Sequence, residues 1–140
     1  MTSWIAGAAR KRIVVVDDDE AILNLVATRL EIAGHEVHKA KDGFAGFRRI
    51  LDVRPAAIVL DLNMPLSDGF DLLDRLSRAS ADVQAPVLVL SAQNADDDVR
   101  RAIRMGATDF LAKPFSTTGL LSRVARLLRS APPVSRTVRQ

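Results

Sequence analysis

Side chains that can do chemistry stand at the ends of four short segments that are rich in apolar residues. They are Asp17 and Asp18 after residues 13–16, Asp61 after residues 56–60, Ser91 after residues 87–90, and Lys113 after residues 108–112. Carboxylates that crowd together repel one another, and a divalent cation such as Mg2+ relieves the repulsion by taking oxygen ligands. An aspartate can also form an aspartyl-phosphate, whose charge an ammonium and a hydroxyl group compensate. These residue types predict phosphoryl transfer at a metal site if the fold brings them together.

The segments before these residues are predicted to be strands of one parallel sheet. Residues 13–16, 56–60 and 87–90 are β-branched or Leu-rich without polar alternation, which is typical of strands buried on both faces. Weaker strands are predicted over residues 36–40 and 108–112, and helical patterns separate all five strands. This alternation indicates an α/β fold with helices on both faces of the sheet. Open parallel sheets bind ligands beyond the carboxyl ends of their strands, where the chemical residues fall.

Apolar residues at helical spacing mark the face that each helix is expected to turn toward the sheet. They are Ile22, Val26, Leu30 and Ala33; Phe44, Phe47 and Leu51; Phe70, Leu73 and Leu76; Val99, Ile103 and Gly106; and Leu120, Val124, Leu127 and Leu128. Gly34 is predicted to cap the C-terminus of the first helix, and Ser116 the N-terminus of the fifth. Asp19 and residues 96–98 are interpreted as first-turn charges that favour the helix dipole.

Composition and charge restrict the classes of protein to which the chain can belong. The 140 residues include 48% apolar residues and no Cys, which excludes a disordered chain, a disulfide scaffold and a thiol nucleophile. Residues 13–122 hold twelve basic and seventeen acidic residues, whereas the two ends hold eight basic residues and no acidic one. Because the body is acidic, nucleic-acid binding by this chain alone is not expected. His35 and His38 lie away from the strand ends that carry Asp17, Asp18 and Asp61, and we interpret them as surface residues.

Length and terminal composition predict the domain organisation and the location. No segment has the roughly 20 apolar residues that a membrane span requires, and the N-terminal basic cluster follows an apolar patch, the reverse of a secretory signal. We therefore expect a cytoplasmic protein with no membrane association. A single domain is predicted over residues 12–130, with an N-terminal tail over residues 1–11 and a C-terminal tail or linker start over residues 131–140.

Four motifs together resemble the receiver domain of bacterial two-component response regulators. They are Val16-Asp17-Asp18; Leu60-Asp61-Leu62-Asn63-Met64-Pro65 with Asp68-Gly69; Leu90-Ser91-Ala92; and residues 106–115, which include Phe110 and end in Lys113-Pro114-Phe115. The motifs are in order and correctly separated, and the resemblance runs from about residue 12 to residue 128. It implies a doubly wound (βα)5 flavodoxin-like sheet with strand order 2-1-3-4-5. It also implies a signalling protein that is not an enzyme beyond assisting its own phosphorylation and dephosphorylation.

The resemblance implies a metal site and a phosphoacceptor. Asp61 is the implied acceptor of a phosphoryl group. The implied cofactor is Mg2+, with Mn2+ as a possible substitute. Asp61 is among the implied metal residues, Asp18 would bind the ion directly, Asp17 would bind through water, and Asn63 would offer its backbone carbonyl.

The resemblance also implies the groups that bind the phosphoryl oxygens and transmit the signal. Ser91, Ala92 and Lys113 are the implied phosphoryl-binding residues. Ser91 and Phe110 are the implied switch pair, in which the ring turns inward when the hydroxyl moves toward the phosphate. The peptide bond between Lys113 and Pro114 is expected to be cis.

The implied partners are a sensor histidine kinase or a histidine phosphotransferase, and an output protein. The output protein, or a second copy of the chain, is expected at the face of the fourth helix, fifth strand and fifth helix, where arginines favour a partner with carboxylates. We expect a stand-alone receiver; the alternative is the receiver of a longer response regulator with an effector domain beyond residue 140. A remote alternative is an aspartyl-nucleophile phosphohydrolase of the haloacid dehalogenase type, although that family places Asp-x-Asp after its first strand.

Overall fold

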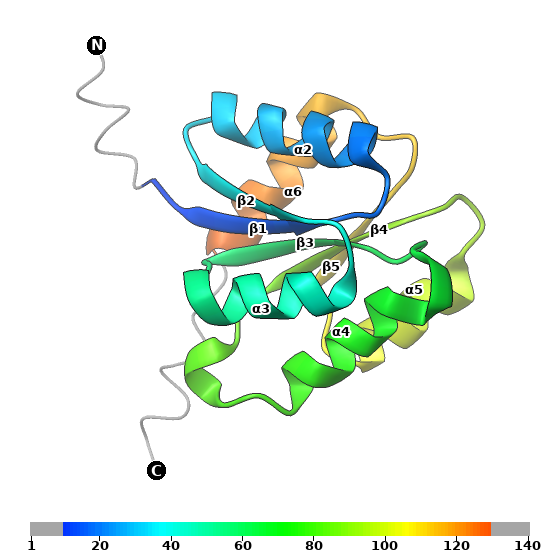
Figure 1. Ribbon diagram of the computed structural model, residues 1–140. Helices are drawn as coiled ribbons and strands as arrows, with labels where there is room; N and C mark the ends of the chain where they lie inside the picture. Colours follow the sequence, from blue (N-terminus) through cyan, green and yellow to red (C-terminus); the bar gives the residue numbers. More distant parts are fainter. Residues whose placement is uncertain (1–9, 130–140) are drawn as a thin grey trace.

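Five parallel strands form one sheet in the order β2-β1-β3-β4-β5 (Figure 1). The structure is a computed structural model and describes residues 10–129. The strands are β1 (Arg12–Val16), β2 (Glu36–Ala40), β3 (Ala57–Asp61), β4 (Val87–Ser91) and β5 (Asp109–Ala112), and all four pairings are parallel. The predicted α/β fold and strand order are confirmed, and each predicted strand agrees to within one residue at either end.

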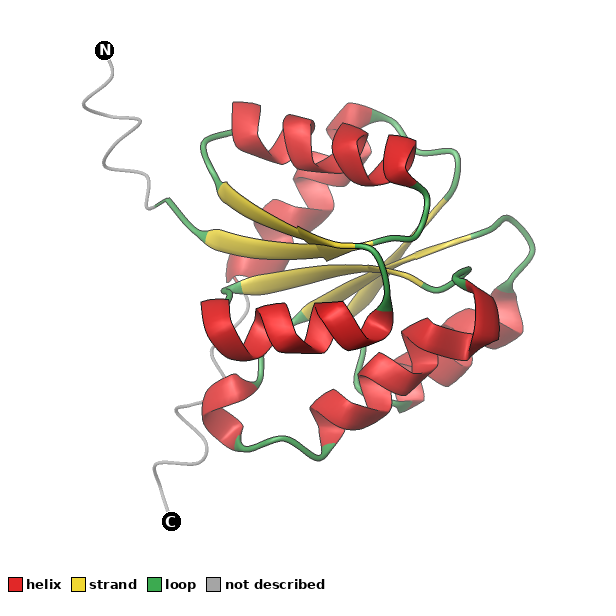
Figure 2. Ribbon diagram, in the orientation of Figure 1, coloured by secondary structure: helices red, strands yellow, loops and turns green. Residues whose placement is uncertain are grey.

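Helices cover both faces of the sheet (Figures 1 and 2). On one face lie α2 (Glu20–Ile32) and α6 (Thr117–Arg129), and on the other lie α3 (Gly43–Val53), α4 (Asp68–Ser77) and α5 (Asp96–Arg104). Two 3-10 helices, η1 (Pro65–Ser67) and η2 (Ala81–Val83), precede α4 and β4. Within the described part of the chain, no helix is long and apolar enough to cross a membrane. The predicted tails, apart from Arg10 and Lys11, lie outside the described residues.

Alternate residues of each strand enter different cores, because successive side chains of a strand point to opposite faces. In β1, Ile13 and Val15 pack under α2 and α6, whereas Val14 and Val16 pack under α3 and α4. All four side chains are fully buried. Burial on both faces explains why the strand sequences show no polar alternation.

The buried face of α3 differs from the prediction. Gly46 and Ile50 face the sheet, whereas Phe44 and Leu51 are 64% and 38% exposed. A Cβ atom on Gly46 would lie 2.9 Å from Cγ2 of Val16, so the glycine allows α3 to pack closely against β1. The helix therefore buries its glycine-containing side and leaves two large apolar side chains in solvent.

Two other helices also present a different residue to the core than predicted. In α5, Ala102 is fully buried, while Ile103 is 42% exposed. Gly106 lies beyond the end of α5 at φ 110°, and Ala33 is an exposed residue at the end of α2. The apolar spacing identified each helix, but packing against the sheet decided which side of it is buried.

The predicted helix ends are confirmed, with one refinement. Gly34 has a φ of 103° and ends α2 in the left-handed conformation that glycine tolerates. The hydroxyl of Ser116 accepts a hydrogen bond from the N–H of Gly119 at 2.9 Å at the start of α6. Asp19 is the N-cap of α2, and its carboxylate accepts hydrogen bonds from the N–H groups of Ala21 and Ile22. It therefore precedes the first turn of the helix. Residues 96–98 form the first turn of α5 as predicted.

Candidate functional site

Three aspartates meet at the carboxyl ends of β1 and β3. One carboxylate oxygen from each of Asp17, Asp18 and Asp61 lies within 4.8 Å of the other two. Asp61 is the last residue of β3, and Asp17 follows β1, the neighbouring strand, so parallel pairing brings them to one edge. Asp17 and Asp61 are buried, and Asp18 is exposed. The structure thus brings together the three carboxylates that the sequence singled out.

Burial has a large effect on Asp17. Desolvation raises the pKa of this carboxyl group from its ordinary value of 3.8 to about 7. A hydrogen bond of 2.9 Å from the N–H of Asp19 lowers the pKa, and the neighbouring Asp61 carboxylate raises it.

Oδ2 of Asp17 also fits a metal ligand. This oxygen is buried and has no hydrogen-bond partner among the described residues. A buried oxygen without a donor, on a residue whose carboxylate lies close to two others, matches the all-oxygen ligand set of Mg2+. The residues at this edge therefore fit a divalent cation.

Lys113 and Asn63 hold one oxygen of Asp61. Nζ of Lys113 and the backbone N–H of Asn63 both donate to Oδ1 of Asp61, each at 3.0 Å. The peptide bond between Lys113 and Pro114 is cis. An ammonium beside a buried carboxylate compensates its charge and would compensate that of an attached phosphoryl group.

Ser91 and Ala92 lie at the end of β4, between the acidic edge and β5. Ser91 is almost fully buried, and Ala92, the next residue, is exposed. The backbone N–H of Lys113 donates to the carbonyl of Ser91 at 2.7 Å, which joins the ends of β4 and β5. The hydroxyl therefore lies one strand from Asp61 and one strand from the β5 residues.

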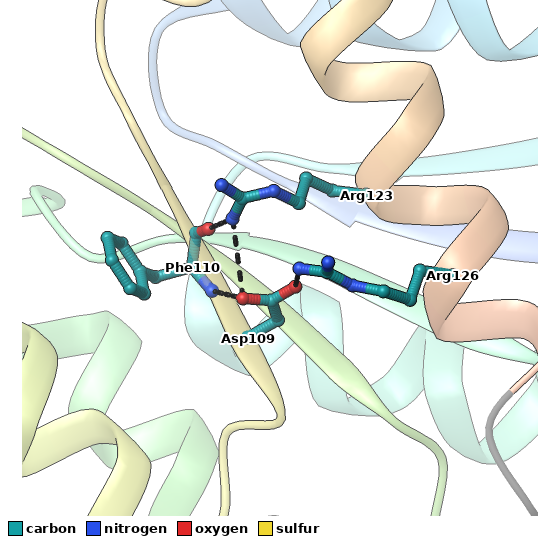
Figure 3. A network of polar contacts seen from close by, with 4 residues as sticks. All are labelled: Asp109, Phe110, Arg123 and Arg126. Carbon is teal, nitrogen blue, oxygen red and sulfur yellow. Dashed lines mark hydrogen bonds and ion pairs between the residues drawn. The ribbon is translucent and has the colours of Figure 1, made fainter.

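Phe110 points away from the sheet and is 41% exposed (Figure 3). Its N–H donates to Oδ1 of Asp109 at 2.8 Å, and its carbonyl accepts a hydrogen bond from Arg123. The guanidinium carbon of Arg123 lies 5.8 Å from the centroid of the Phe110 ring. The backbone of the predicted switch residue is therefore held on both its N–H and its carbonyl side.

Asp109 organises this face, and the sequence analysis missed it. Its carboxylate accepts from Arg126 at 2.7 Å and from Arg123 at 3.3 Å (Figure 3). Burial favours the neutral acid, but the hydrogen bonds from Arg126 and the Phe110 N–H outweigh it, and the pKa of Asp109 is lowered. The i, i+3 spacing of the two arginines on α6 was the available signal. The single carboxylate offsets one of their two charges, so this face carries less net positive charge than its arginines alone suggest.

An apolar pocket lies beside the acidic edge and was also missed. Its volume is about 460 Å3, and Ile22 and Leu25 of α2, Ala92, and the segment Lys113–Phe115 contribute to its lining. These residues come from three separate parts of the chain. No local sequence pattern predicts such a pocket, because the tertiary fold brings its lining residues together.

The two histidines lie away from this edge of the sheet, at the start of β2 and in its middle. His35 precedes β2, and His38 lies within it with Nε2 2.6 Å from Oε2 of Glu36. Both were interpreted as surface residues, and both are half-buried. Burial, followed by the nearby charge of Lys11, lowers the pKa of His35.

A family model described as "Response regulator receiver domain" matches residues 13–125. The chain belongs to the response regulator receiver family. It is 42% identical over 118 residues to the DNA-binding dual master transcriptional regulator RpaA of Synechocystis sp., covering 84% of this chain and 49% of that protein. It is 34% identical over 123 residues to the phosphate regulon transcriptional regulatory protein PhoB of Pseudomonas aeruginosa, covering 88% of this chain and 54% of that protein. The receiver thus spans about half the length of the curated relatives that it matches.

Solved receiver structures share the fold of this receiver. The Francisella response regulator 1452 receiver domain aligns with a TM-score of 0.76 at 32% identity, over 86% of this chain and 98% of that one. The chemotaxis response regulator CheY4 of Vibrio cholerae aligns with a TM-score of 0.78 at 29% identity, over 85% of this chain and 99% of that one. The predicted family is therefore confirmed.

Proposed function

We propose that Asp61 accepts a phosphoryl group from a sensor histidine kinase or a histidine phosphotransferase and so switches the receiver on. The observation that carries this proposal is the cluster of the buried Asp17 and Asp61 with the exposed Asp18, together with the ammonium of Lys113 3.0 Å from Asp61. A carboxylate oxygen of Asp61 would form the new bond to phosphorus while the bond from phosphorus to the donor imidazole nitrogen breaks. The leaving imidazole takes up a proton.

We propose Mg2+, with Mn2+ as a substitute, as the cofactor at this edge. Asp17, Asp18 and Asp61 would hold it, together with the backbone carbonyl of Asn63. The bound ion would neutralise the carboxylates and the incoming phosphoryl oxygens, which otherwise repel one another. The unpartnered Oδ2 of Asp17 supports this assignment.

The remaining edge residues would bind the phosphoryl group and pass on the signal. The ammonium of Lys113, the hydroxyl of Ser91 and the backbone N–H of Ala92 are the proposed donors to its oxygens. Ser91 and Phe110 form the proposed switch, in which movement of the hydroxyl toward the phosphate makes room for the ring. The exposed ring supports an outward resting position.

The apolar pocket beside Lys113 is the proposed docking site for the protein that donates the phosphoryl group. Ile22, Leu25 and Phe115 line it, and Lys113 lies both in this pocket and beside Asp61. A donor protein that covers these side chains would exclude water from the acidic edge and bring its phosphohistidine to Asp61. We therefore propose this pocket as the contact for the kinase or phosphotransferase.

The wider role is proposed from the family. The relatives are named as transcriptional regulators, and we propose that this receiver likewise controls an output protein in the cytoplasm, or forms dimers, through α5, β5 and α6. Whether it acts alone or within a longer regulator is decided by the length of the gene. A phosphohydrolase of the haloacid dehalogenase type is disfavoured because the central aspartate ends β3.

The test is labelling by a small phosphodonor. Wild-type protein incubated with acetyl phosphate and Mg2+ should acquire one acid-stable, base-labile phosphoryl group. Asp61→Asn should abolish it, because an amide is not a nucleophile here, and so should removal of Mg2+ by a chelator. Asp71→Asn, a change at an exposed position of α4, is the matched control and should label normally. Undiminished labelling of Asp61→Asn would assign the acceptor elsewhere.

A further inference from the structure

The groove between β2 and α3 combines exposed cations with an exposed aromatic ring. Its volume is about 530 Å3, and its lining residues do not include Asp17, Asp18 or Asp61 of the acidic edge. The basic and aromatic lining residues are Lys39, Lys41, Phe44, Arg48 and Arg49, and the acidic ones are Asp42 and Asp52. Four cations therefore face two carboxylates.

Most of this positive charge has no carboxylate partner among residues 10–129. Arg48 makes no ion pair, and its guanidinium carbon lies 5.9 Å from the centroid of the Phe44 ring. Lys39 and Arg49 donate to neutral oxygens, at 2.8 Å and 3.2 Å. Lys41 alone approaches a carboxylate, at 3.9 Å. The groove thus carries more positive charge than its surroundings neutralise.

The arginines on the α5 and α6 face are arranged differently. Arg100 pairs with Asp97 within α5, and Arg123 and Arg126 both pair with Asp109. Among residues 10–129, no ion pair is described for Arg101 or Arg104 of the same face, and Arg101 lies over the Phe70 ring. The share of cations with a carboxylate partner is therefore smaller in the groove, one of four, than among these five arginines, three of five.

The groove also borders apolar surface that no described residue covers. Phe44 is 64% exposed, and Leu51, which is seven residues later on the same side of α3, is 38% exposed. These two side chains are outside because Gly46 and Ile50 occupy the face that packs against the sheet. Exposed aromatic rings beside arginines are typical of the centres of protein interfaces.

We propose that this groove binds an acidic protein segment that lays a large apolar side chain against Phe44. Carboxylates of the segment would pair with Arg48, Arg49 and Lys39, and its apolar side chain would cover the Phe44 ring and Leu51. A protein segment is favoured over a nucleic-acid strand because its apolar side chain can cover the aliphatic Leu51 as well as the Phe44 ring. The site is separate from Asp61 and does not depend on the proposed phosphorylation.

The test measures fluorescence anisotropy with the full 140-residue chain and a labelled synthetic peptide in which Glu and Leu residues are interspersed. The peptide should bind saturably, and Arg48→Glu and Phe44→Ser should each weaken binding about tenfold or more. A peptide with Lys in place of each Glu should not bind, and one with Ser in place of each Leu should bind about tenfold more weakly. Added salt should weaken binding, as expected for partly exposed charges.

Two matched variants on α2 test whether the effects are local. Arg29→Glu reverses an exposed arginine, and Ile32→Ser removes an apolar side chain that is 74% exposed, both outside the groove. Both should bind the peptide within about twofold of wild type. Asp61→Asn should also bind the peptide normally. Loss of peptide binding would therefore contradict the groove proposal alone, and unchanged labelling of Asp61→Asn by acetyl phosphate would contradict the phosphoacceptor assignment alone.

Amide chemical shifts locate the contact. On addition of the Glu–Leu peptide, the largest changes should fall within residues 39–52. The proposal is overturned if the peptide fails to saturate, if Arg48→Glu binds it as tightly as wild type, or if the shifts fall elsewhere. Tighter binding of a single-stranded RNA oligonucleotide than of the peptide, with the same dependence on Phe44, would instead assign the groove to nucleic acid.

Discussion

At the residue scale, two buried aspartates at one edge of the sheet have different partners. Asp61 receives hydrogen bonds from an ammonium and an amide on one oxygen, whereas Oδ2 of Asp17 is buried without a donor. A carboxylate that loses water and gains too few donors is destabilised as the anion. Asp17 should therefore respond to pH and to Mg2+, and Asp61 to mutation of Lys113.

The carboxyl group of Asp17 should titrate near pH 7 in magnesium-free buffer, as measured by its 13C chemical shift. Because the folded state favours the neutral form, the stability that Asp17 contributes is present below pH 4 and is lost as the pH rises through 7. The free energy of unfolding should fall across this window, and Asp17→Asn should flatten the fall. Mg2+ favours the anion and should move the midpoint to lower pH. A midpoint near 4 without the metal would show that burial does not control this group.

Lys113→Ala should leave a folded protein, because the side chain lies at the edge of the sheet and outside both cores. Loss of its charged hydrogen bond to Asp61 should lower the free energy of unfolding by about 1–3 kcal/mol. Phosphorylation should then couple less strongly to partner binding and to the amide signals of α5, β5 and α6. Urea unfolding followed by circular dichroism measures the first effect, with Lys113→Arg as the variant that keeps the charge. A largely unfolded Lys113→Ala protein would assign the residue a structural role.

At the element scale, two residues between or at the ends of helices have the positive φ that glycine adopts most easily. Leu66 in η1 has a φ of 61°, and its side chain is 92% exposed. Gly34 at the end of α2 has a φ of 103°, and a side chain there would meet open space. The left-handed conformation costs an L-residue roughly 1–2 kcal/mol, so the two positions should respond oppositely to exchange with glycine.

Leu66→Gly should raise the free energy of unfolding by up to about 1 kcal/mol, because relief of the left-handed cost exceeds the extra entropy of an unfolded glycine. Gly34→Ala should lower it by about 1–2 kcal/mol for the opposite reason. Thermal and chemical unfolding of the pair measures both changes. Destabilisation by Leu66→Gly would mean that the exposed leucine makes a stabilising contact.

At the scale of the whole molecule, the order of the sheet connects the acidic edge with the α5, β5 and α6 face. Asp61 ends β3, Ser91 ends the neighbouring β4, and Phe110 lies in β5 opposite Val89. A signal from Asp61 thus crosses two strand pairings to reach the exposed ring. Coupling of this kind requires an element with two discrete arrangements that the phosphate biases.

Beryllofluoride, which mimics the phosphoryl group on an aspartate, should shift amide signals along residues 99–126 as well as at the acidic edge. Ser91→Ala should confine the shifts to the edge, because it removes the hydroxyl that is expected to move toward the phosphoryl group. Heteronuclear NMR spectra of the two proteins with and without beryllofluoride provide the comparison. Shifts that still reach α6 in Ser91→Ala would show that another route carries the signal.

Local sequence patterns were sufficient to predict the order of strands and helices and the residues at the carboxyl edge of the sheet. These depend on local properties, namely the periodicity of apolar residues and the position of Asp61, Ser91 and Lys113 after strands, which parallel pairing brings to one edge. The motifs that carry the family resemblance are likewise contiguous, so no tertiary information was needed to find them.

The buried side of each helix and the pairing of charges depend on contacts between elements, and local patterns did not predict them. Phe44 and Leu51 satisfy a helical spacing as well as Ile50 does, and the close approach of Gly46 to β1 chooses between them. The pairing of Asp109 with two arginines of α6, and the burial that raises the pKa of Asp17, arise from segments far apart in the chain. Spacing along one helix or strand carries no information on such contacts, because they depend on how elements lie against one another.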